Sequence, residues 1–236
     1  MDIPTYVITG ASRGIGRDTA THLAAQGNPI RILAIARNAK KLDELKAELD
    51  KHENCDAHVV AADLTVPEQS HIAAWLDEHG PVDGLLNNAG LLINRPFGEL
   101  DEADWRAMIE INLMAPARLV RLLLPYFRRS NAHIVNVSSM GGYQGSAKFP
   151  GLSAYSASKG ALAILSECLA EELKDKGISV NCLSLGAVQT EMLAQAFPGY
   201  QAPLNSMEMA DYFAWFLQEG HRFFNGKNLP VSISTP

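Results

Sequence analysis

Two kinds of hydrophobic pattern alternate along the chain. Short runs of β-branched and aliphatic residues, many of them apolar throughout, are typical of strands that helices cover on both faces. These strand candidates are Tyr6–Thr9, Ile30–Ala36, His58–Ala61, Gly84–Asn87, Ala132–Val137, Ile178–Leu183 and Leu229–Ile233. The helix candidates between them are Ile15–Gln26, Ala39–Lys51, Pro67–His79, Glu102–Phe127, Ala154–Lys176 and Met207–Gln218. The alternation predicts a doubly wound α/β fold with a parallel sheet, and Pro116 predicts a kink or break in the fourth helix.

The composition fits one folded domain over residues 1–236. Of the 236 residues, 47% are hydrophobic and 19% are charged, so the chain can bury a sizeable core. A formal net charge of −6 disfavours a general nucleic-acid or anionic-membrane surface. The three scattered cysteines give no disulfide framework, and neither a secretory signal nor a membrane-length apolar stretch is visible. We therefore expect a cytoplasmic protein that binds neither nucleic acid nor membrane.

The turn after the first strand is rich in glycine. It reads Thr9-Gly10-Ala11-Ser12-Arg13-Gly14-Ile15-Gly16 and leads into the first predicted helix. The glycines allow a close approach of the backbone to a ligand, and free N–H groups at the helix start favour a pyrophosphate. The context of strand, turn and helix predicts a dinucleotide site that is formed by Gly10, Ser12, Arg13, Gly14, Ile15 and Gly16.

The same turn also matches a second motif. Gly10 to Gly14 fit G-x-S-x-G, the nucleophile elbow of α/β-hydrolases, with Ser12 as the nucleophile. An elbow needs earlier strands to supply an oxyanion loop, whereas only nine residues precede Gly10. Late in the chain, His221 is the histidine available to such a hydrolase. A hydrolase is therefore the weaker interpretation.

Basic residues follow the second strand, where NAD-binding domains carry an acidic residue that binds the ribose 2′-hydroxyl. No Asp or Glu occurs from Thr19 to Leu42, whereas Arg37 follows the strand and Lys40–Lys41 come soon after. A guanidinium can donate a forked pair of hydrogen bonds to a phosphate. We therefore predict NADP(H), with Arg13 and Arg37 on its 2′-phosphate; the alternative is that both arginines are solvated surface residues.

The third predicted strand has polar residues at both ends. His52, Cys55 and His58 at its entrance are metal-ligand types, but no fourth ligand is in view, so we expect no metal site. Asp63, which is followed by Leu64, closes the strand, and strand ends face the ligand crevice of such sheets. Its carboxylate either accepts a hydrogen bond from the adenine amino group or stabilises a turn.

Tyr155 and Lys159 lie at the start of the fifth predicted helix. Because they are four residues apart, their side chains share one helix face. Lowering the pKa of a tyrosine from about 10 to about 7 takes roughly 4 kcal/mol. One positive charge about 4 Å away supplies a similar energy at an effective dielectric near 20. The pair is a candidate general acid whose pKa the lysine lowers, although an isolated pair of this kind is more often surface decoration.

Taken together, the motifs resemble the short-chain dehydrogenase/reductase family over nearly the whole chain. They are Thr9-Gly10-x-x-x-Gly14-x-Gly16, Asn87-Asn88-Ala89-Gly90, Asn112, Val137-Ser138-Ser139 and Tyr155-x-x-x-Lys159. The resemblance implies a seven-stranded Rossmann-type sheet in the order 3-2-1-4-5-6-7 with helices on both faces. It also implies an oxidoreductase, usually a homodimer or homotetramer, that interconverts a small carbonyl compound and its alcohol with NADP(H).

The resemblance assigns a role to each candidate catalytic residue. Tyr155 gives its proton to the carbonyl oxygen as hydride leaves nicotinamide C4. Ser139, with Ser138 as the alternative, positions and polarises that carbonyl. Lys159 lowers the pKa of the tyrosine and holds the nicotinamide ribose, and Asn112 anchors a water on the proton path.

The resemblance also extends the cofactor site. Asn88-Ala89-Gly90 is expected to line the nucleotide and stiffen the sheet, with an asparagine-rich turn as the alternative. After the sixth strand, Gly186 and Val188 are expected at the carboxamide, with Thr190 nearby. Tyr155 and Lys159 of the catalytic group are expected to contact the cofactor as well.

Two departures from the family pattern border the expected substrate cleft. Leu185 stands where the family usually has proline, and the stretch from Ser139 to Tyr155 is a few residues longer than usual. The region of about residues 190–206 occupies the position of a substrate lid. The substrate and the product stereochemistry are therefore left open. A catalytically silent NADP-binding sensor or scaffold is the alternative function, although such proteins generally lack the tyrosine or the lysine.

Overall fold

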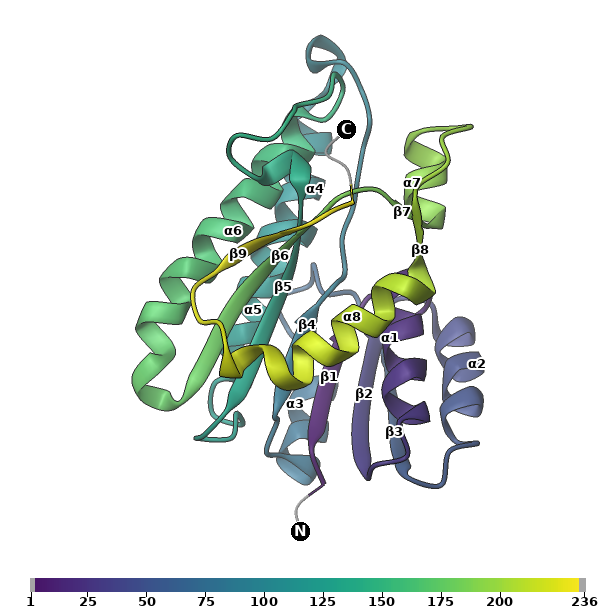
Figure 1. The fold of residues 1–236 in the computed structure, drawn as a ribbon, viewed down its shortest axis with the longest axis vertical. Coiled ribbons are helices and arrows are strands. Elements are labelled where there is room, and N and C mark those ends of the chain that lie inside the picture. The colour runs from purple at the N-terminus through teal and green to yellow at the C-terminus, as the bar shows by residue number, and fades with distance from the viewer. Residues whose placement is uncertain (1–2, 234–236) are drawn as a thin grey trace.

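A parallel seven-stranded sheet forms the centre of the protein in the computed structural model, which describes residues 3–233 (Figure 1). The strand order is β3-β2-β1-β4-β5-β6-β9, which confirms the doubly wound Rossmann fold and the predicted order. The strands of this sheet are β1 Thr5–Thr9, β2 Ile30–Ala36, β3 Cys55–Ala61, β4 Gly84–Asn87, β5 Ala132–Ser139, β6 Ile178–Leu185 and β9 Asn228–Val231. The predicted bounds of β2 and β4 agree with the structure, whereas β3 begins earlier than predicted, at Cys55.

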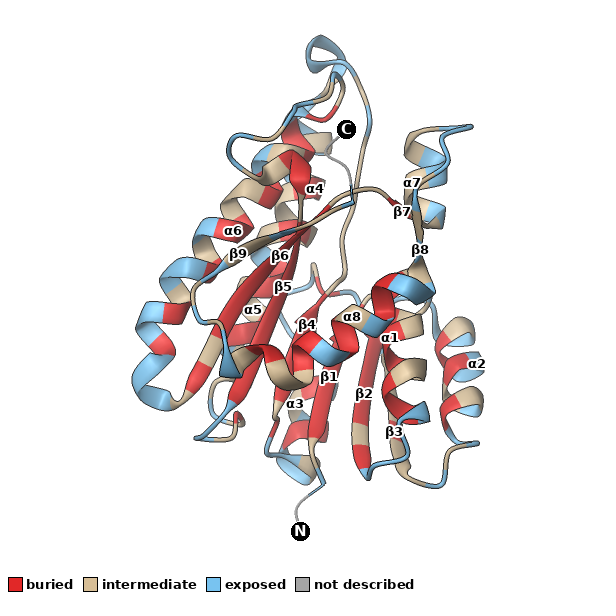
Figure 2. Ribbon diagram, in the orientation of Figure 1, coloured by how far each residue is buried: buried red, intermediate tan, exposed pale blue. Residues whose placement is uncertain are grey.

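Helices cover both faces of the sheet, as predicted (Figure 1). They are α1 Gly14–Ala25, α2 Ala39–Leu49, α3 Ser70–His79, α4 Glu102–Ile109, α5 Ala115–Leu123, α6 Ser153–Leu173, α7 Glu191–Ala196 and α8 Ser206–Glu219. Side chains alternate between the two faces of each strand. In β1, Ile8 packs into the core under α1, α2 and α8, whereas Val7 packs into the core under α3, α5 and α6. The inner strands β1, β2, β4, β5 and β6 are therefore buried almost throughout, whereas the edge strands β3 and β9 are mostly half-buried (Figure 2).

The long fourth helical pattern is interrupted, but not where proline alone would place the break. Glu110–Met114 forms a π-helical segment between α4 and α5, and the Ala115 N–H bonds the Glu110 carbonyl. Pro116 follows in the first turn of α5, where its missing N–H costs no helical hydrogen bond. The interruption therefore precedes the proline, and it contains Asn112.

The region after β6 has structure that the hydrophobic pattern did not predict. Strands β7, Val188–Gln189, and β8, Leu204–Asn205, pair in parallel as a small second sheet, with α7 between them. Two-residue strands and a six-residue helix are too short to give a hydrophobic period. This small sheet brings α7 to the edge at which the carboxyl ends of the main strands meet.

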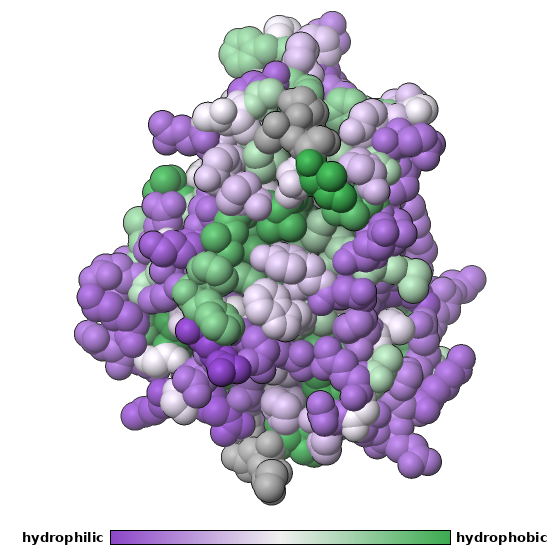
Figure 3. Space-filling view, in the orientation of Figure 1, coloured by the Kyte–Doolittle hydropathy of each residue, from purple (hydrophilic) through white to green (hydrophobic). Residues whose placement is uncertain are grey.

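The surface shown in Figure 3 is hydrophilic around its margins, with hydrophobic residues gathered over β9 and α8. Within residues 3–233, no helix has the combined length and apolar character that crossing a bilayer requires. The single domain predicted over residues 1–236 includes residues 1–2 and 234–236, which lie outside the described part of the chain.

A buried histidine makes stability depend on pH. His133 is fully buried in β5, where its Nδ1 lies 3.2 Å from the Leu217 carbonyl oxygen and its Nε2 lies 3.0 Å from Asn181 Nδ2. These partners suit the neutral ring with its proton on Nδ1. Burial lowers the pKa of His133 to about 4, whereas an unfolded chain has a histidine pKa near 6.5.

We predict that acid weakens the fold through His133. The unfolded state binds more protons between about pH 6.5 and pH 4, so the free energy of unfolding falls as the pH falls through that window. Between pH 7 and pH 5 the histidine should account for a loss of about 2 kcal/mol. Urea unfolding of His133→Gln at both pH values should lack this loss, whereas His71→Gln, at an exposed position, should retain it. Equal pH dependence in His133→Gln and the unmodified protein would contradict the assignment.

Candidate active site

One large cavity lies at the carboxyl ends of the main strands. Its volume is about 1180 Å³, larger than the roughly 300–1,000 Å³ of a typical single-ligand pocket. The loops that follow β1, β2, β3, β4, β5 and β6 all contribute to its lining, as does α7. Every cofactor residue predicted from the sequence except Gly16 lines it, and so do Ser139, Tyr155 and Lys159.

The glycine-rich turn is held by the segment after β4. Asn88 Nδ2 donates to the Thr9 carbonyl at 3.1 Å, and the Thr9 hydroxyl oxygen accepts from the backbone of Asn88 and Ala89. A Cβ on Gly16 would come within 2.5 Å of Asn88 Nδ2, so the two segments can meet only because residue 16 is glycine. Gly16 therefore serves the packing of the turn rather than the cavity surface. Asn88 therefore connects the segment after β4 to the end of β1.

The start of α1 faces the cavity with unused backbone donors. Gly14, with φ of 55°, is the first residue of the helix, and the side chain of Arg13 does not cap it. Ser12, Gly14 and Ile15 line the cavity at this point. A helix N-terminus with free N–H groups attracts an anionic group. This part of the cavity therefore fits the pyrophosphate of a dinucleotide.

Basic side chains line the same end of the cavity. Arg13, Arg37 and Lys41 all reach its surface. Arg13 forms an ion pair with Glu191, the first residue of α7, and Lys41 Nζ lies 3.5 Å from the same carboxylate. The basic cluster lowers the pKa of Glu191, with the hydrogen bond from Arg13 as the largest cause. A carboxylate from α7 thus lies in the region where a 2′-phosphate is expected.

Asp63 stabilises a turn and faces the cavity. Its Oδ1 accepts hydrogen bonds from the Thr65 N–H at 2.9 Å and the Thr65 hydroxyl at 2.8 Å. These bonds, followed by the charge of Arg37, hold the pKa of Asp63 below its usual value. The neighbouring Leu64 is buried and also lines the cavity. Both interpretations of Asp63 therefore remain compatible with its position.

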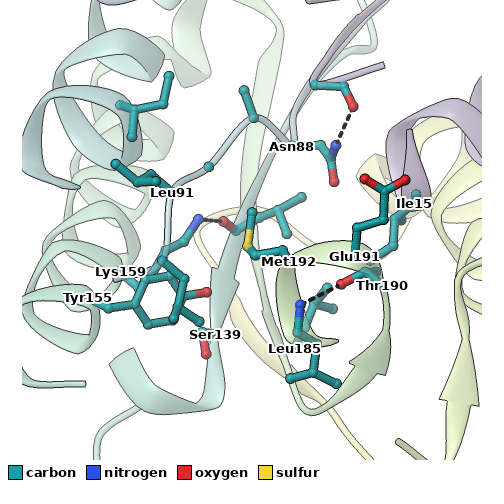
Figure 4. Close-up of a pocket in the computed structure, with 18 of the residues that line it drawn as sticks. Ile15, Asn88, Leu91, Ser139, Tyr155, Lys159, Leu185, Thr190, Glu191 and Met192 are labelled. Carbon is teal, nitrogen blue, oxygen red and sulfur yellow. Dashed lines mark hydrogen bonds between the residues drawn. The ribbon is translucent and has the colours of Figure 1, made fainter. Parts of the chain in front are cut away.

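Tyr155 and Ser139 lie side by side below the opening of the cavity (Figure 4). Tyr155 is buried in the first turns of α6, and the hydroxyl of Ser139, the last residue of β5, is near enough to lower its pKa. The hydroxyl of Ser138 instead donates to the Lys159 carbonyl at 2.8 Å, inside the protein. Of the two serines, only the hydroxyl of Ser139 is therefore placed beside the phenol.

Lys159 lies beneath the cavity as a buried cation. Its ammonium donates to the Val137 carbonyl at 2.7 Å and lies 6.0 Å from the centre of the Tyr155 ring. Burial lowers the pKa of Lys159 to about 8. The pKa of Tyr155 is raised, because burial disfavours the phenolate more than the nearby Ser139 hydroxyl favours it. The net shift is therefore opposite to the expected one because of burial, and the contribution of Lys159 to the pKa of Tyr155 stays a prediction.

Asn112 connects three elements around the catalytic lysine. Its Oδ1 accepts from the Leu91 N–H at 2.9 Å, and its Nδ2 donates to the Leu91 carbonyl and to Ser158 Oγ, each at 2.9 Å. A Cβ on Gly90 would lie 3.2 Å from Asn112 Oδ1 and 3.5 Å from Lys159 Nζ. The π-helical segment thus fixes the loop after β4 directly above the ammonium group.

The segment after β6 forms the wall opposite Tyr155. Gly186 packs on the last strand, because a Cβ there would come within 2.2 Å of Ser232 Oγ. Val188 is buried and pairs with Leu204, and Thr190 caps α7 by accepting from the Leu193 N–H at 3.2 Å. The predicted lid region is therefore built from α7 and β8.

These features place the chain among known proteins. The model of the short chain dehydrogenase family matches residues 4–201. The chain belongs to this family. An uncharacterized oxidoreductase of Staphylococcus epidermidis is 30% identical to it over 216 residues, which cover 90% of each chain. A fatty acyl-CoA reductase of Acinetobacter baylyi is 35% identical over 218 residues, which cover 89% of this chain and 71% of the relative.

Solved structures of short-chain dehydrogenases superpose along the whole fold. A short-chain dehydrogenase of Burkholderia cenocepacia, in complex with NADP, has a TM-score of 0.84 at 25% identity, covering 97% of this chain and 96% of the other. L-sorbose reductase of Gluconobacter frateurii, complexed with NADPH and L-sorbose, has a TM-score of 0.83 at 26% identity, covering 100% and 98%. The chain is thus similar to reductases whose names give different substrates, a fatty acyl-CoA and L-sorbose.

Sequence reasoning missed two contributors to the site of this short-chain dehydrogenase. Glu191 was not singled out, although an acidic residue directly after a capping threonine is a signal for a helix start. Phe149 lines the cavity from the lengthened stretch before Tyr155, and no pattern in a loop indicates which side chain turns inward. Leu185 lines the cavity too, so both departures from the family pattern do border it.

The residues of the alternative hydrolase and metal-site motifs are not brought together by the fold. The ring of His221 packs on His133, which is level with Tyr6 near the start of β1, whereas Ser12 follows the end of that strand. The elbow serine and the histidine are therefore at opposite ends of the sheet. His58 contacts Asp56 and packs against Trp75 and His79, and residues 3–233 contain no cluster of three or more His, Cys, Asp or Glu that could hold a metal ion.

We predict that Asn112→Leu destabilises the protein by about 2–4 kcal/mol. The change keeps the volume but leaves the Leu91 N–H and carbonyl without their partner, whereas Ser158 Oγ keeps its bond to the Tyr155 carbonyl. Each buried group left unpaired costs about 1–3 kcal/mol. Urea unfolding measures the loss. Asn28→Leu, at an exposed position before β2, is the matched control. Equal stability of the two variants would show that Asn112 does not hold the loop after β4.

Proposed function

We propose that the protein is an NADP(H)-dependent oxidoreductase that reduces a ketone or aldehyde to an alcohol, reversibly. The observation that carries the proposal is the position of the Tyr155 hydroxyl. It lies beside Ser139 and above Lys159, in the same cavity as the glycine-rich turn and the basic cluster. A proton donor and a dinucleotide site that share one cavity are the two parts that carbonyl reduction needs.

The lining residues fit NADP(H) at each part of the cofactor. The start of α1 suits the pyrophosphate, and Arg13, Arg37 and Lys41 suit a 2′-phosphate. We assign Asp63 and Leu64 to the adenine end and Gly186, Val188 and Thr190 to the carboxamide, and the position of all five in the cavity lining supports this. The neighbours from Burkholderia cenocepacia and Gluconobacter frateurii were crystallised with NADP and NADPH, which supports the same choice here.

The catalytic residues divide the work of proton transfer. When bound, the cofactor supplies the hydride that reaches the carbonyl carbon. Tyr155 gives its proton to the carbonyl oxygen, and Ser139 donates a hydrogen bond that orients this oxygen. A raised pKa keeps Tyr155 protonated at neutral pH, so it is ready to act as an acid in the reduction direction.

Lys159 and Asn112 support the proton donor. With a pKa of about 8, Lys159 is mostly charged at pH 7, and its ammonium favours the phenolate that remains after proton transfer. Asn112 keeps the loop after β4 above this ammonium through its two bonds to Leu91. We propose that Asn112 also anchors a water that returns a proton towards Lys159.

The wider properties of the protein follow from the same assignment. We propose one catalytic domain over residues 1–236, a cytoplasmic location and assembly as a homodimer or homotetramer. The reductase names of the relatives from Acinetobacter baylyi and Gluconobacter frateurii support the direction of the reaction.

We predict that Tyr155→Phe lowers kcat for carbonyl reduction by a factor of about 10²–10⁴, because a positioned general acid contributes that much. The Kd for NADPH, measured by fluorescence titration, should change less than threefold or so. Tyr143→Phe is the matched control, because Tyr143 lies in the same stretch but does not line the cavity. Undiminished turnover in Tyr155→Phe would refute the acid role. NADPH binding without turnover of any carbonyl in the unmodified protein would instead favour a sensor or scaffold.

We predict opposite effects of two charge changes on cofactor choice. Arg37→Asp should raise the Kd for NADPH by about 10- to 100-fold, because a charge-assisted hydrogen bond is worth about 1.5–3 kcal/mol, and should spare NADH. Glu191→Gln should lower the Kd for NADPH by about two- to fivefold, because its carboxylate no longer opposes the phosphate for Arg13 and Lys41. Glu171→Gln, whose ion pair with Lys174 lies on α6, is the control. An unchanged ratio of NADPH to NADH affinity in Arg37→Asp would overturn the 2′-phosphate assignment.

A further inference from the structure

The two ends of the cavity differ in charge. The charged residues that line it are Arg13, Arg37, Lys41, Asp63, Arg106, Glu110, Lys159 and Glu191. Five of them belong to the cofactor end, in the loops after β1, β2 and β3 and at the start of α7. Lys159 lies beneath the floor, bound to the Val137 carbonyl. The space beyond Tyr155 therefore receives little charge from the chain.

The remaining two charges are already paired. Arg106 lies 2.5 Å from Glu102 on the outer side of α4, and Glu110 forms an ion pair with Arg118 of α5. Both pairs belong to the helices that flank the opening. A polar substrate would have to compete with these partners for either group.

Apolar side chains from three loops surround Tyr155. Tyr155 forms a buried cluster with Met108 and Ala154, and Leu91, Leu92 and Ile93 of the loop after β4 pack against this cluster. Figure 4 shows Met192 and Leu185 across the cavity from Tyr155 and Ser139. The further lining residues in this part of the cavity are Met140, Phe149, Leu152, Leu193, Phe197 and Tyr200. Among them, the Tyr200 hydroxyl is the polar side-chain group, and Tyr200 is 44% exposed.

The three loops are fixed to one another, so this apolar wall is preformed. Asn94 Nδ2 donates to the Ala196 carbonyl of α7 at 2.8 Å. The Arg95 N–H donates to the Gly151 carbonyl at 3.0 Å. Gly151 has a φ of 86°, and a Cβ there would lie 2.0 Å from Asn94 Oδ1, so the loops meet only because residue 151 is glycine. Asn94 and Arg95 thus join the loop after β4 to α7 on one side and to the loop that carries Phe149 on the other.

We propose that the substrate is an apolar carbonyl compound, an alkyl or aryl ketone or aldehyde, and that Phe149 and Leu193 help to select it. The proposal rests on the proposed function and names its substrate class. Each methylene that such a substrate buries here gains about 0.8 kcal/mol. The hydroxyls of a sugar would lose water without finding partners, at about 1–3 kcal/mol for each one. The cavity thus favours substrates with longer alkyl chains over substrates that carry several hydroxyl groups.

The test is NADPH oxidation with two matched series. In 2-butanone, 2-hexanone and 2-octanone, kcat/KM should rise about three- to fourfold for each methylene, which is the factor that 0.8 kcal/mol gives. Erythrulose, a four-carbon 2-ketone that carries three hydroxyls and cannot close into a furanose ring, should be used at least tenfold less well than 2-butanone. A flat first series, or erythrulose turned over as well as 2-butanone, would overturn the substrate class and leave the proposed function standing.

Variants show whether the apolar wall is responsible. Phe149→Asn should remove the rise of kcat/KM with the chain length of the ketone and leave the Kd for NADPH unchanged. Phe149→Leu should retain that rise. Leu193→Asn supplies a second polar change on a different loop. Phe223→Asn is the control, because Phe223 is 64% exposed and does not line the cavity. An unaltered series in both Phe149→Asn and Leu193→Asn would overturn the role of these two residues.

A binding measurement separates failure of the substrate class from failure of the reaction. Calorimetric titration of the NADPH-bound protein, in which an alcohol cannot be oxidised, with 1-butanol, 1-hexanol and 1-octanol should give falling Kd with chain length and a negative heat-capacity change, the sign of apolar burial. If Kd falls with chain length but no ketone or aldehyde is turned over, the proposed function is overturned and the apolar site is supported. Equal Kd values along the alcohol series would overturn the apolar site itself.

Discussion

The joint between the end of β5 and the start of α6 controls the chemistry of this protein. Three contacts lock it: the Ser138 hydroxyl bonds the Lys159 carbonyl, the Lys159 ammonium bonds the Val137 carbonyl, and Gly142 packs against the backbone of Gly160. A Cβ on Gly142 would come within 2.5 Å of the Gly160 nitrogen, so the approach requires glycine. Because neighbouring residues of a strand point to opposite sides, fixing Ser138 inward turns Ser139 outward, towards Tyr155. The pairing of serine and tyrosine is therefore a consequence of how strand and helix are joined.

The same joint explains the unusual charge state of the site. A buried ammonium is costly unless it is hydrogen-bonded, and the Val137 carbonyl provides that bond. Burial also raises the pKa of Tyr155 and lowers that of Lys159. In the protein by itself, the phenol is therefore held in its protonated form.

Much of this could be predicted from the sequence, for reasons that differ from element to element. The fully buried strands β2 and β4 were predicted with their correct bounds, because continuous apolar runs between polar turns leave little freedom. The motif residues reached one cavity because parallel strands end at one edge. The π-helical segment was not predicted: its register depends on the bonds of Asn112 to Leu91, which lies far from it in the chain. The pKa of Tyr155 is raised rather than lowered, because four-residue spacing places two side chains on one helix face but does not say how deeply the phenol is buried.

Topology also accounts for the uneven charge of the cavity. The loops after β1, β2 and β3 leave one half of the sheet and carry Arg13, Arg37, Lys41 and Asp63. The loops after β4, β5 and β6 leave the other half and carry leucine, methionine and phenylalanine towards Tyr155. The strand order reverses direction between β1 and β4, so one crevice receives a polar wall and an apolar wall from separate parts of the chain. Glu191 lies where they meet, at the first turn of α7: its carboxylate reaches the basic cluster, and the next residue, Met192, faces the apolar side. Glu191 thus connects the basic cluster to the helix that carries Met192.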